Sequence, residues 1–268
     1  MSAWAGLYFF AGDFGGTCVL PGGNARIVRE MVDRLEAKTP GRLMTGKMVA
    51  RIRPAAGGWR VTTVDRRGKA AVLASKTIVV ASPKHVVAKM VEGLADDQLR
   101  AMSAIHRRAY LVANVLLKRP ILRDLYGGYT LGGDDYGDLG VAEWPSRKPT
   151  KRSVLTLYRP FCDDISRPQL LVDGFFGAFQ SHARDYMLRT FGRQGLKGED
   201  IADVRLARWG HSMIYPSPGQ LSDGVYEVAG RPLKGLWFAC QDSFGAPCLE
   251  AALGAAFQSA AAAKKHLG

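Results

Sequence analysis

The stretch that decides the fold is Leu236-Trp-Phe-Ala-Cys-Gln-Asp242, which Ser-Phe-Gly-Ala-Pro-Cys-Leu249 joins to Glu250-Ala-Ala-Leu-Gly-Ala-Ala256. The apolar residues 236–240 predict a short buried strand, and Asp242 follows at its end. Small residues dominate 250–266 and predict a helix that can pack very closely on a sheet or a ligand. A buried strand that leads toward such a helix fits a mixed α/β chain.

The first third of the chain predicts one helix and then short strands. Asn24 follows the turn Pro21-Gly22-Gly23 and is placed to cap a helix. Apolar residues recur at helical spacing up to Pro40-Gly41, at Ile27, Val28, Met31, Val32 and Leu35. The β-rich pieces 49–52, 59–64 and 77–81 are separated by turns, and their spacing predicts a β-meander.

The middle of the chain differs in character from both flanks. Helical patterns are expected over 85–90 and 95–107, and a strand over 109–117. Residues 118–170 are rich in turn signals, with paired glycines and aspartates. A long helix over 177–193 and a strand over 204–209 complete the expected elements.

Composition bounds the class of protein. The chain has 268 residues, of which 47% are hydrophobic and 23% charged, and this excludes a collagen, a disulfide scaffold and a disordered chain. The formal net charge of +13 suggests a nucleic-acid partner, but the densest basic run, 147–152, has no interleaved aromatic residues. Nucleic-acid binding is therefore not favoured. The run fits a solvated loop, with a docking face for an acidic partner as the alternative.

Cysteine usage and the termini indicate a compartment. Cys18, Cys162, Cys240 and Cys248 are few and scattered, and they favour a reducing, cytoplasmic environment. The apolar opening 3–11 has no basic segment before it and is followed by Asp13, which argues against a signal peptide. No apolar stretch reaches the ~20 residues that a membrane-spanning helix needs.

Several sequence motifs that would carry chemistry are rejected. Residues 41–48 nearly match a phosphate-binding loop, but Met48 replaces the hydroxyl residue and the segment runs from helix to strand. The histidines show no metal-ligand spacing, so no metal site is predicted. A G-x-S-x-G elbow is also missing from the sequence. No catalytic side chain is assigned.

Three separated segments form one recognisable order. These are the "PGG" turn with its helix, the Val49-x-x-Ile52 strand with a meander ending in Ile78-Val79-Val80-Ala81-Ser82-Pro83, and a final Trp strand, Phe238-Ala239 strand and Glu250-x-Ala252 helix. This order resembles the FAD-dependent amine oxidase and phytoene desaturase superfamily. The resemblance covers most of the chain and implies an α/β fold, with an FAD-binding-type region and an inserted substrate region.

The resemblance also implies a cofactor site for FAD. The backbone of Val49 would meet the adenine edge, and Asp242 would accept hydrogen bonds from ribityl or ribose hydroxyls. Backbone N–H groups at Glu250, Ala251 and Ala252 would face negative charge on the flavin or a phosphate, because a helix N-terminus leaves N–H groups unpaired. Taken singly, Val49 also fits a core strand and Asp242 a turn.

The resemblance places aromatic residues on the substrate side of the flavin. Trp209 and Tyr215 stand at these positions, and ordinary core packing explains them equally well. His211 would orient substrate or be a satisfied polar residue. Where the family often has a lysine near the flavin, Val112 stands, with Tyr110 and Asn114 as the nearby polar candidates. Ser212 and Met213 stand where covalent flavin attachment would need a cysteine, so FAD is expected to bind non-covalently.

One departure from the family concerns the dinucleotide-binding half. The family begins with a G-x-G-x-x-G turn, and the glycine-rich segment 12–16 does not match it. We expect a second polypeptide to supply that half, in a hetero-oligomer, unless the chain is truncated or diverged.

The whole pattern predicts two regions and one chemistry. Residues 1–82 and 205–268 would build the FAD-side region, and 83–204 the substrate region. The expected reaction removes a hydride from a C–N or C–C bond of a small molecule. The alternatives are a non-catalytic binding or regulatory subunit without FAD and, more weakly, a basic nucleic-acid-binding protein.

Overall fold

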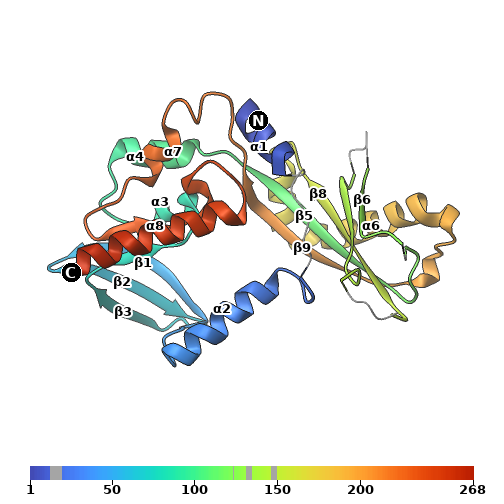
Figure 1. Ribbon diagram of the computed structural model, residues 1–268, viewed down its shortest axis with the longest axis horizontal. Coiled ribbons are helices and arrows are strands. Elements are labelled where there is room, and N and C mark those ends of the chain that lie inside the picture. The colour runs from blue at the N-terminus through green and yellow to red at the C-terminus, as the bar shows by residue number, and fades with distance from the viewer. Residues whose placement is uncertain (13–19, 123, 131–134, 146–149) are drawn as a thin grey trace. The chain divides into compact units, whose positions relative to one another are not determined.

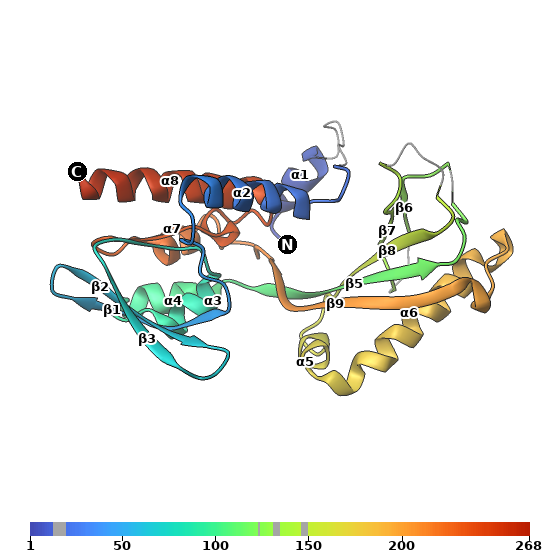
Figure 2. The ribbon, with the colours of Figure 1, turned by 90° about the horizontal axis from the view of Figure 1, so that it is seen from below.

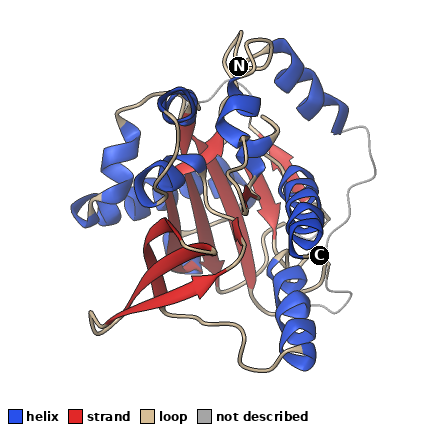
Figure 3. Cartoon of the chain, turned by 90° about the vertical axis from the view of Figure 1, so that its left-hand side faces the viewer, coloured by secondary structure: helices blue, strands red, loops and turns tan. Residues whose placement is uncertain are grey.

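The computed structural model describes residues 1–12, 20–122, 124–130, 135–145 and 150–268. Helices and strands both make up large parts of the structure, which confirms the predicted mixed α/β class (Figure 3). The chain forms two compact units. Unit 1 contains Met1–Gly16, Arg34–His106 and Ile214–Gly268, and unit 2 contains Thr17–Asp33 and Arg107–Met213.

Unit 1 contains an antiparallel meander of β1 (Lys47–Ala55), β2 (Gly58–Asp65) and β3 (Ala70–Ser75) (Figure 1). The turn between β1 and β2 requires glycine at Gly58. Its φ is 151°, and a Cβ there would lie 2.3 Å from the carbonyl oxygen of Ser75. β1 is an edge strand of this sheet, with a register shift between Val49 and Arg51.

A second, two-stranded sheet in unit 1 corrects the expected meander. β4 (Ile78–Val80) pairs in parallel with β10 (Leu236–Phe238), whereas β3 is the third strand of the meander. Val80, Leu236 and Phe238 are all buried in one core. The two short apolar strands therefore lie side by side in the core, although their paired residues are 158 positions apart in the sequence.

Helices complete the core of unit 1. α3 (Lys84–Met90) and α4 (Asp96–Ala104) bury Val87, Met90 and Met102 with the strands. α1 (Ala3–Gly12), α7 (Val225–Gly230), the 3-10 turn η4 (Gln241–Ser243) and α8 (Leu249–Leu267) also belong to this unit. The hydroxyl of Ser259 in α8 donates a buried hydrogen bond of 3.0 Å to the carbonyl of Phe238, and this bond holds α8 against β10.

α2 (Ala25–Lys38) has the predicted helical stripe, but each of its residues, all of them described, is exposed or half-exposed. Val28, Met31 and Leu35 are among the exposed large apolar side chains of the chain. Residues 25–33 of α2 belong to unit 2, and residues 34–38 belong to unit 1.

Unit 2 is built on a sheet of five strands in the order β6-β7-β8-β5-β9. Its strands are β5 (Arg107–Leu117), β6 (Gly127–Tyr129), β7 (Asp138–Val141), β8 (Ser153–Pro160) and β9 (Ile201–Ile214). α5 (Ser166–Leu171) and α6 (Phe176–Phe191) follow β8, with 3-10 turns at Asp173–Phe175, Gly192–Gln194 and Gly198–Asp200.

One face of the unit 2 sheet carries the core. β5 and β8 alternate strictly, with Leu111, Ala113 and Val115 buried beside Leu155 and Leu157. α6 lies along this side of the sheet (Figure 2), and its Phe179, Ala183 and Met187 pack into the same core. The opposite residues of β5, β7 and β8 stay half-exposed.

The structure departs from the sequence expectations in two further ways. Residues 118–170, expected to be turn-rich, also contain β6, β7, β8 and α5. The units change at residues 106/107 and 213/214, so the helices at 84–104 pack with unit 1 rather than beside the segment after 107. Their apolar residues are buried in the core of unit 1, which explains the difference. Residues 13–16 of the glycine-rich segment, Cys18, and residues 147–149 of the basic run lie outside the described residues.

In the part of the chain that the structure describes, no helix combines the length and the apolar character that crossing a bilayer requires. Among the same residues no group of three or more His, Cys, Asp and Glu side chains is arranged to hold a metal ion.

Candidate functional site

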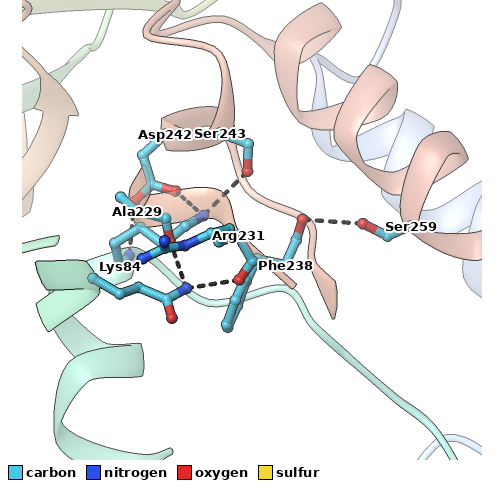
Figure 4. A network of polar contacts seen from close by, with 8 residues as sticks. Lys84, Ala229, Arg231, Phe238, Asp242, Ser243 and Ser259 are labelled. Carbon is cyan, nitrogen blue, oxygen red and sulfur yellow. Dashed lines mark hydrogen bonds and ion pairs between the residues drawn. The ribbon is translucent and has the colours of Figure 1, made fainter. Parts of the chain in front are cut away.

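The connection between β10 and α8 contains a fully buried ion pair. Nζ of Lys84 lies 3.2 Å from Oδ1 of Asp242 and donates at 3.1 Å to Oγ of Ser243. The backbone N–H of Lys84 donates to Oδ2 of Asp242 at 2.7 Å. Figure 4 shows these groups converging beside Phe238, whose ring centroid lies 5.2 Å from the ammonium. The pair fixes the start of α3 to the end of β10.

Burial changes the interpretation of Asp242. Both side chains of the pair are 0% exposed, and each oxygen of the carboxylate accepts a hydrogen bond from Lys84. As folded, this carboxylate faces the protein interior rather than a surface that a ribityl chain could reach. The half-exposed side chain of Gln241 precedes it. A direct contact of Asp242 with the cofactor stays a prediction.

The N-terminus of α8 is capped by a residue of the chain itself. Cys248 is the N-cap, and its Sγ accepts a hydrogen bond of 3.4 Å from the N–H of Ala251. First-turn N–H groups lack partners within a helix and form the positive end of its dipole. Glu250 is exposed, Ala252 is half-buried and Ala251 is buried. The N–H of Ala252 donates to the carbonyl of Cys248 at 3.4 Å, so the N–H groups of Ala251 and Ala252 both have partners within the chain. A contact of this turn with the cofactor stays a prediction.

Val49 lies in the edge strand β1, and the residue is 39% exposed. An edge strand leaves alternate backbone N–H and C=O groups unpaired by the sheet. The register shift next to Val49 also disturbs its pairing with β2. A contact between the backbone of Val49 and the adenine edge stays a prediction.

The three predicted substrate residues fall in different units. Trp209 and His211 lie in β9 two residues apart, so they share one face of that strand, and Trp209 is 56% exposed. Tyr215 belongs to unit 1, where its N–H donates to the carbonyl of His106 at 2.8 Å and its hydroxyl contacts the amino group of Met1. The structure does not bring Tyr215 together with the other two in one unit.

The half-exposed face of the unit 2 sheet contains a pocket of about 680 Å³. Cross-strand partners share a face, and the register places Tyr129, Asp138 and Tyr158 in one row across β6, β7 and β8. The next row on the same face is Gly127, Gly140 and Thr156. Because two glycines stand beside a row of large side chains, the sheet surface is hollowed there.

Aromatic side chains frame this pocket. The rings of Tyr110 and Tyr158 lie 6.3 Å apart between centroids, and those of Tyr126 and Trp144 are separated by the same distance. Burial, the negative charge of Asp138 and the neighbouring Tyr158 raise the pKa of Tyr110 to about 12. Burial and Asp138 likewise raise the pKa of Tyr158. Both phenols therefore stay neutral well above physiological pH.

The sequence does not predict this pocket. It indicates Tyr110 and Asn114 as polar candidates near the flavin, beside Val112, and both lie on this face of the sheet, since Val112 pairs with Tyr158 and Asn114 with Thr156. Asp138, Tyr126, Trp144 and Tyr158 were missed. The alternation of Leu155 and Leu157 with Thr156 and Tyr158 is the signal that could have revealed β8.

The family model for flavin containing amine oxidoreductases matches residues 1–172, which is 172 of the 268 residues. The chain belongs to the flavin containing amine oxidoreductase family. The resemblance that the motifs predict is thereby confirmed.

One curated relative and several solved structures resemble this chain. An oxidoreductase, PigB, from Serratia sp. (strain ATCC 39006) is 28% identical over 279 residues, covering 100% of this chain and 41% of its own length. A redesigned putrescine oxidase superposes with a TM-score of 0.66 at 13% identity, over 91% of this chain and 53% of its own. Cyclohexylamine oxidase from Brevibacterium oxydans IH-35A superposes with a TM-score of 0.62 at 16% sequence identity, over 91% of this chain and 53% of its own. The chain thus spans about half the length, or less, of these relatives.

A flavin fits some of the family positions better than others. Val49 lies on an edge strand and residues 250–252 lie in the first turn of a helix, which are places where flavin nucleotides can meet backbone polar groups. The buried pair of Lys84 and Asp242 joins the first turn of α3 to the 3-10 turn η4, between β10 and α8. In this family member, the acidic residue is therefore suited to positioning the connection from β10 to α8.

Proposed function

We propose that this flavin containing amine oxidoreductase family member is a flavin-dependent oxidoreductase that removes a hydride from a C–N or C–C bond of a small molecule. The observation that carries the proposal is the family match over residues 1–172, because the family is defined by its flavin. A bound flavin supplies the hydride acceptor. The chain supplies binding, orientation and electrostatics.

FAD is the cofactor of this proposal, and it binds non-covalently. The backbone at Val49 would hold the adenine edge. The first turn of α8, at Glu250, Ala251 and Ala252, would stabilise negative charge on the flavin or its phosphates. Support for non-covalent binding comes from Ser212 and Met213, which stand where an attachment cysteine would be needed.

Each predicted side chain keeps a proposed role. The carboxylate of Asp242 acts through its pair with Lys84, which holds the corner that the cofactor meets. Trp209 and Tyr215 would line the substrate side of the flavin, and His211 would orient the substrate. Tyr110 and Tyr158, which frame the unit 2 pocket, would contact the substrate from the substrate region.

A second polypeptide carrying the dinucleotide-binding half is part of the proposal. Support comes from the relatives, because this chain corresponds to 41–53% of their lengths. Further support is the exposed apolar surface on helices. Val28, Met31 and Leu35 on α2 and Leu249, Leu253 and Phe257 on α8 are large apolar side chains that remain exposed. A cytoplasmic location also belongs to the proposal, supported by Cys162 and Cys248, which form no disulfide.

The test is purification of the chain alone and together with a polypeptide that carries the G-x-G-x-x-G half. We expect the complex to be yellow and to release FAD when it is denatured with acid. Flavin that stays attached to the denatured chain would contradict non-covalent binding. A stable complex without flavin would instead support a non-catalytic regulatory subunit.

A further inference from the structure

A second pocket lies within unit 1, at the edge where β4 and β10 begin. Its volume is about 520 Å³, which is in the range of small-molecule sites. It is lined by the turn between β1 and β2 with its neighbouring residues, by the residues just before β4 and β10, and by the last turn of α8. The positions proposed to hold FAD are not among the described residues that line it.

Close packing around Gly235 brings the polar groups of this pocket together. Gly235 has a φ of 77°, and a Cβ there would lie 3.1 Å from the carbonyl oxygen of Lys76 and 3.4 Å from Nε1 of Trp59. The same point is 3.3 Å from Nε2 of His266. Trp59 is buried, and its indole N–H donates at 3.1 Å to the carbonyl of Lys234. The backbone of both lysines is therefore held by its neighbours.

Two lysines approach the pocket from matching positions of the parallel pair. Leu236 pairs with Ile78, and Lys234 and Lys76 each come two positions before these residues. Both lysines line the pocket together with His266. Within the part of the chain that the structure describes, neither ammonium has a hydrogen bond or an ion pair, and no acidic side chain lines the pocket. Two like charges at one edge repel each other, and a bound anion would relieve that repulsion.

The rest of the lining is largely apolar. Pro54 and Leu233 line the pocket with the ring of Trp59. Glu92 stands next to a lining residue in the sequence, but its carboxylate pairs with Arg51. An apolar wall with a few convergent polar groups is typical of a site for an organic molecule. The basic edge and the apolar wall together favour an organic anion.

We propose that this pocket binds a small organic phosphate, with the phosphate between the ammonium groups of Lys76 and Lys234 and the organic group against Trp59. Two ammonium groups match the two charges of a phosphate monoester, and lysine is a common phosphate ligand. The site is separate from the proposed adenine contact, because Ala55 lies six residues along β1 from Val49, or ~20 Å in a strand. The inference thus goes beyond the proposed function.

The test is a calorimetric titration of the full chain with phenyl phosphate at about pH 8, where the phosphate carries two negative charges. Benzenesulfonate is the first comparison, because it has the same ring and a tetrahedral anion with one charge. Inorganic phosphate is the second, because it lacks the ring. We expect phenyl phosphate to bind roughly tenfold more tightly than either one. Its affinity should fall as the salt concentration rises.

Two variants locate the binding. Lys76→Met and Lys234→Met should each reduce the affinity for phenyl phosphate roughly tenfold, because each removes one charged contact. Lys69→Met is the matched control. Lys69 is an exposed lysine of unit 1 between β2 and β3, outside the pocket, so its variant loses the same charge and should keep the affinity unchanged.

Three results would overturn the inference. The first is equal affinity for phenyl phosphate and either comparison anion. The second is an equal loss in Lys69→Met and the two pocket variants. The third concerns FAD, whose phosphates are the other source of this chemistry, so the pocket variants are also titrated with FAD in the complex with a G-x-G-x-x-G polypeptide. Unchanged FAD affinity supports a separate site, whereas a tenfold loss would assign the pocket to the cofactor.

Discussion

The ammonium of Lys84 and the carboxylate of Asp242 form an ion pair that is completely buried, with 3.2 Å between Nζ and Oδ1. The two residues are 158 positions apart in the sequence. They join the first turn of α3 to the segment between β10 and α8, where the cofactor corner is proposed. Removing one partner would leave the other charge buried without compensation.

Lys84→Met should therefore lower the free energy of unfolding by about 3–5 kcal/mol. Replacing both partners, in Lys84→Met with Asp242→Leu, should recover much of that loss, because no unpaired charge remains. Chemical denaturation of the purified chain provides the measurement. The matched control is Arg51→Met, which removes a partner from the exposed pair with Glu92 and should cost at most about 1 kcal/mol. Equal losses in the two single variants would contradict the importance of the buried pair.

The tyrosines of the unit 2 pocket make a prediction about pH. Since the folded chain raises the pKa of Tyr110 from 10.0 to about 12, it holds that proton more tightly than the unfolded chain does. The stabilisation is fully present below pH 10 and should be lost as the pH rises toward 12. The free energy of unfolding should fall across this window.

Asp138→Asn should shift the ultraviolet titration of Tyr110 and Tyr158 to lower pH, because it removes a negative charge that opposes ionisation. Tyr136 serves as an internal reference. Burial raises its pKa to about 12, and Asp138 is not among the charges that act on it. A shift of all three tyrosines together would indicate unfolding rather than loss of the local charge.

The turn between β1 and β2 predicts a difference between adjacent glycines. Gly58→Ala would place its Cβ 2.3 Å from the carbonyl oxygen of Ser75, so β3 must move. Gly57→Ala meets no atom within 4 Å and suffers only the strain of its φ of 75°, about 1–2 kcal/mol. Thermal unfolding should show the larger loss for Gly58→Ala. Similar losses would contradict the close approach of Ser75.

The first turn of α8 allows helix stability and cofactor binding to be separated. Ala252→Asp adds negative charge near the helix N-terminus, which favours the helix but repels an anionic cofactor group. Affinity for FAD in the complex should fall roughly tenfold, while helix content is unchanged. Ala256→Asp places the same charge one turn farther along, at an exposed position, and is the control. An unchanged FAD affinity in Ala252→Asp would remove the helix N-terminus from the proposed site.

Local pattern predicted those parts of the fold that depend on neighbouring residues. The stripe from Ile27 to Leu35 became α2, and the apolar run at 236–240 contains the buried strand β10. The partner of that strand could not be inferred, because parallel pairing with Ile78–Val80 depends on distant packing. β7 and β8 were hidden by the turn residues around them, although Leu155 and Leu157 alternate with Thr156 and Tyr158.

The candidate site, like the fold, could be predicted from the sequence only in part. The sequence pointed to Val49 and to residues 250–252, where the structure provides an edge strand and a helix N-terminus. It could not predict that Lys84 encloses Asp242, because the two meet only through the pairing of β4 with β10. The sequence did not indicate Asp138 as a site residue, for a related reason. Its significance appears only when β6, β7 and β8 align it with Tyr129 and Tyr158.

Titration of FAD into the complex of this chain with a G-x-G-x-x-G polypeptide tests the central claim most directly. Protein-bound flavin should saturate at about one FAD per chain, and neither polypeptide alone should retain it. Saturable binding that Ala252→Asp weakens, and Ala256→Asp does not, is the predicted result. A complex that forms and binds no FAD would contradict the account.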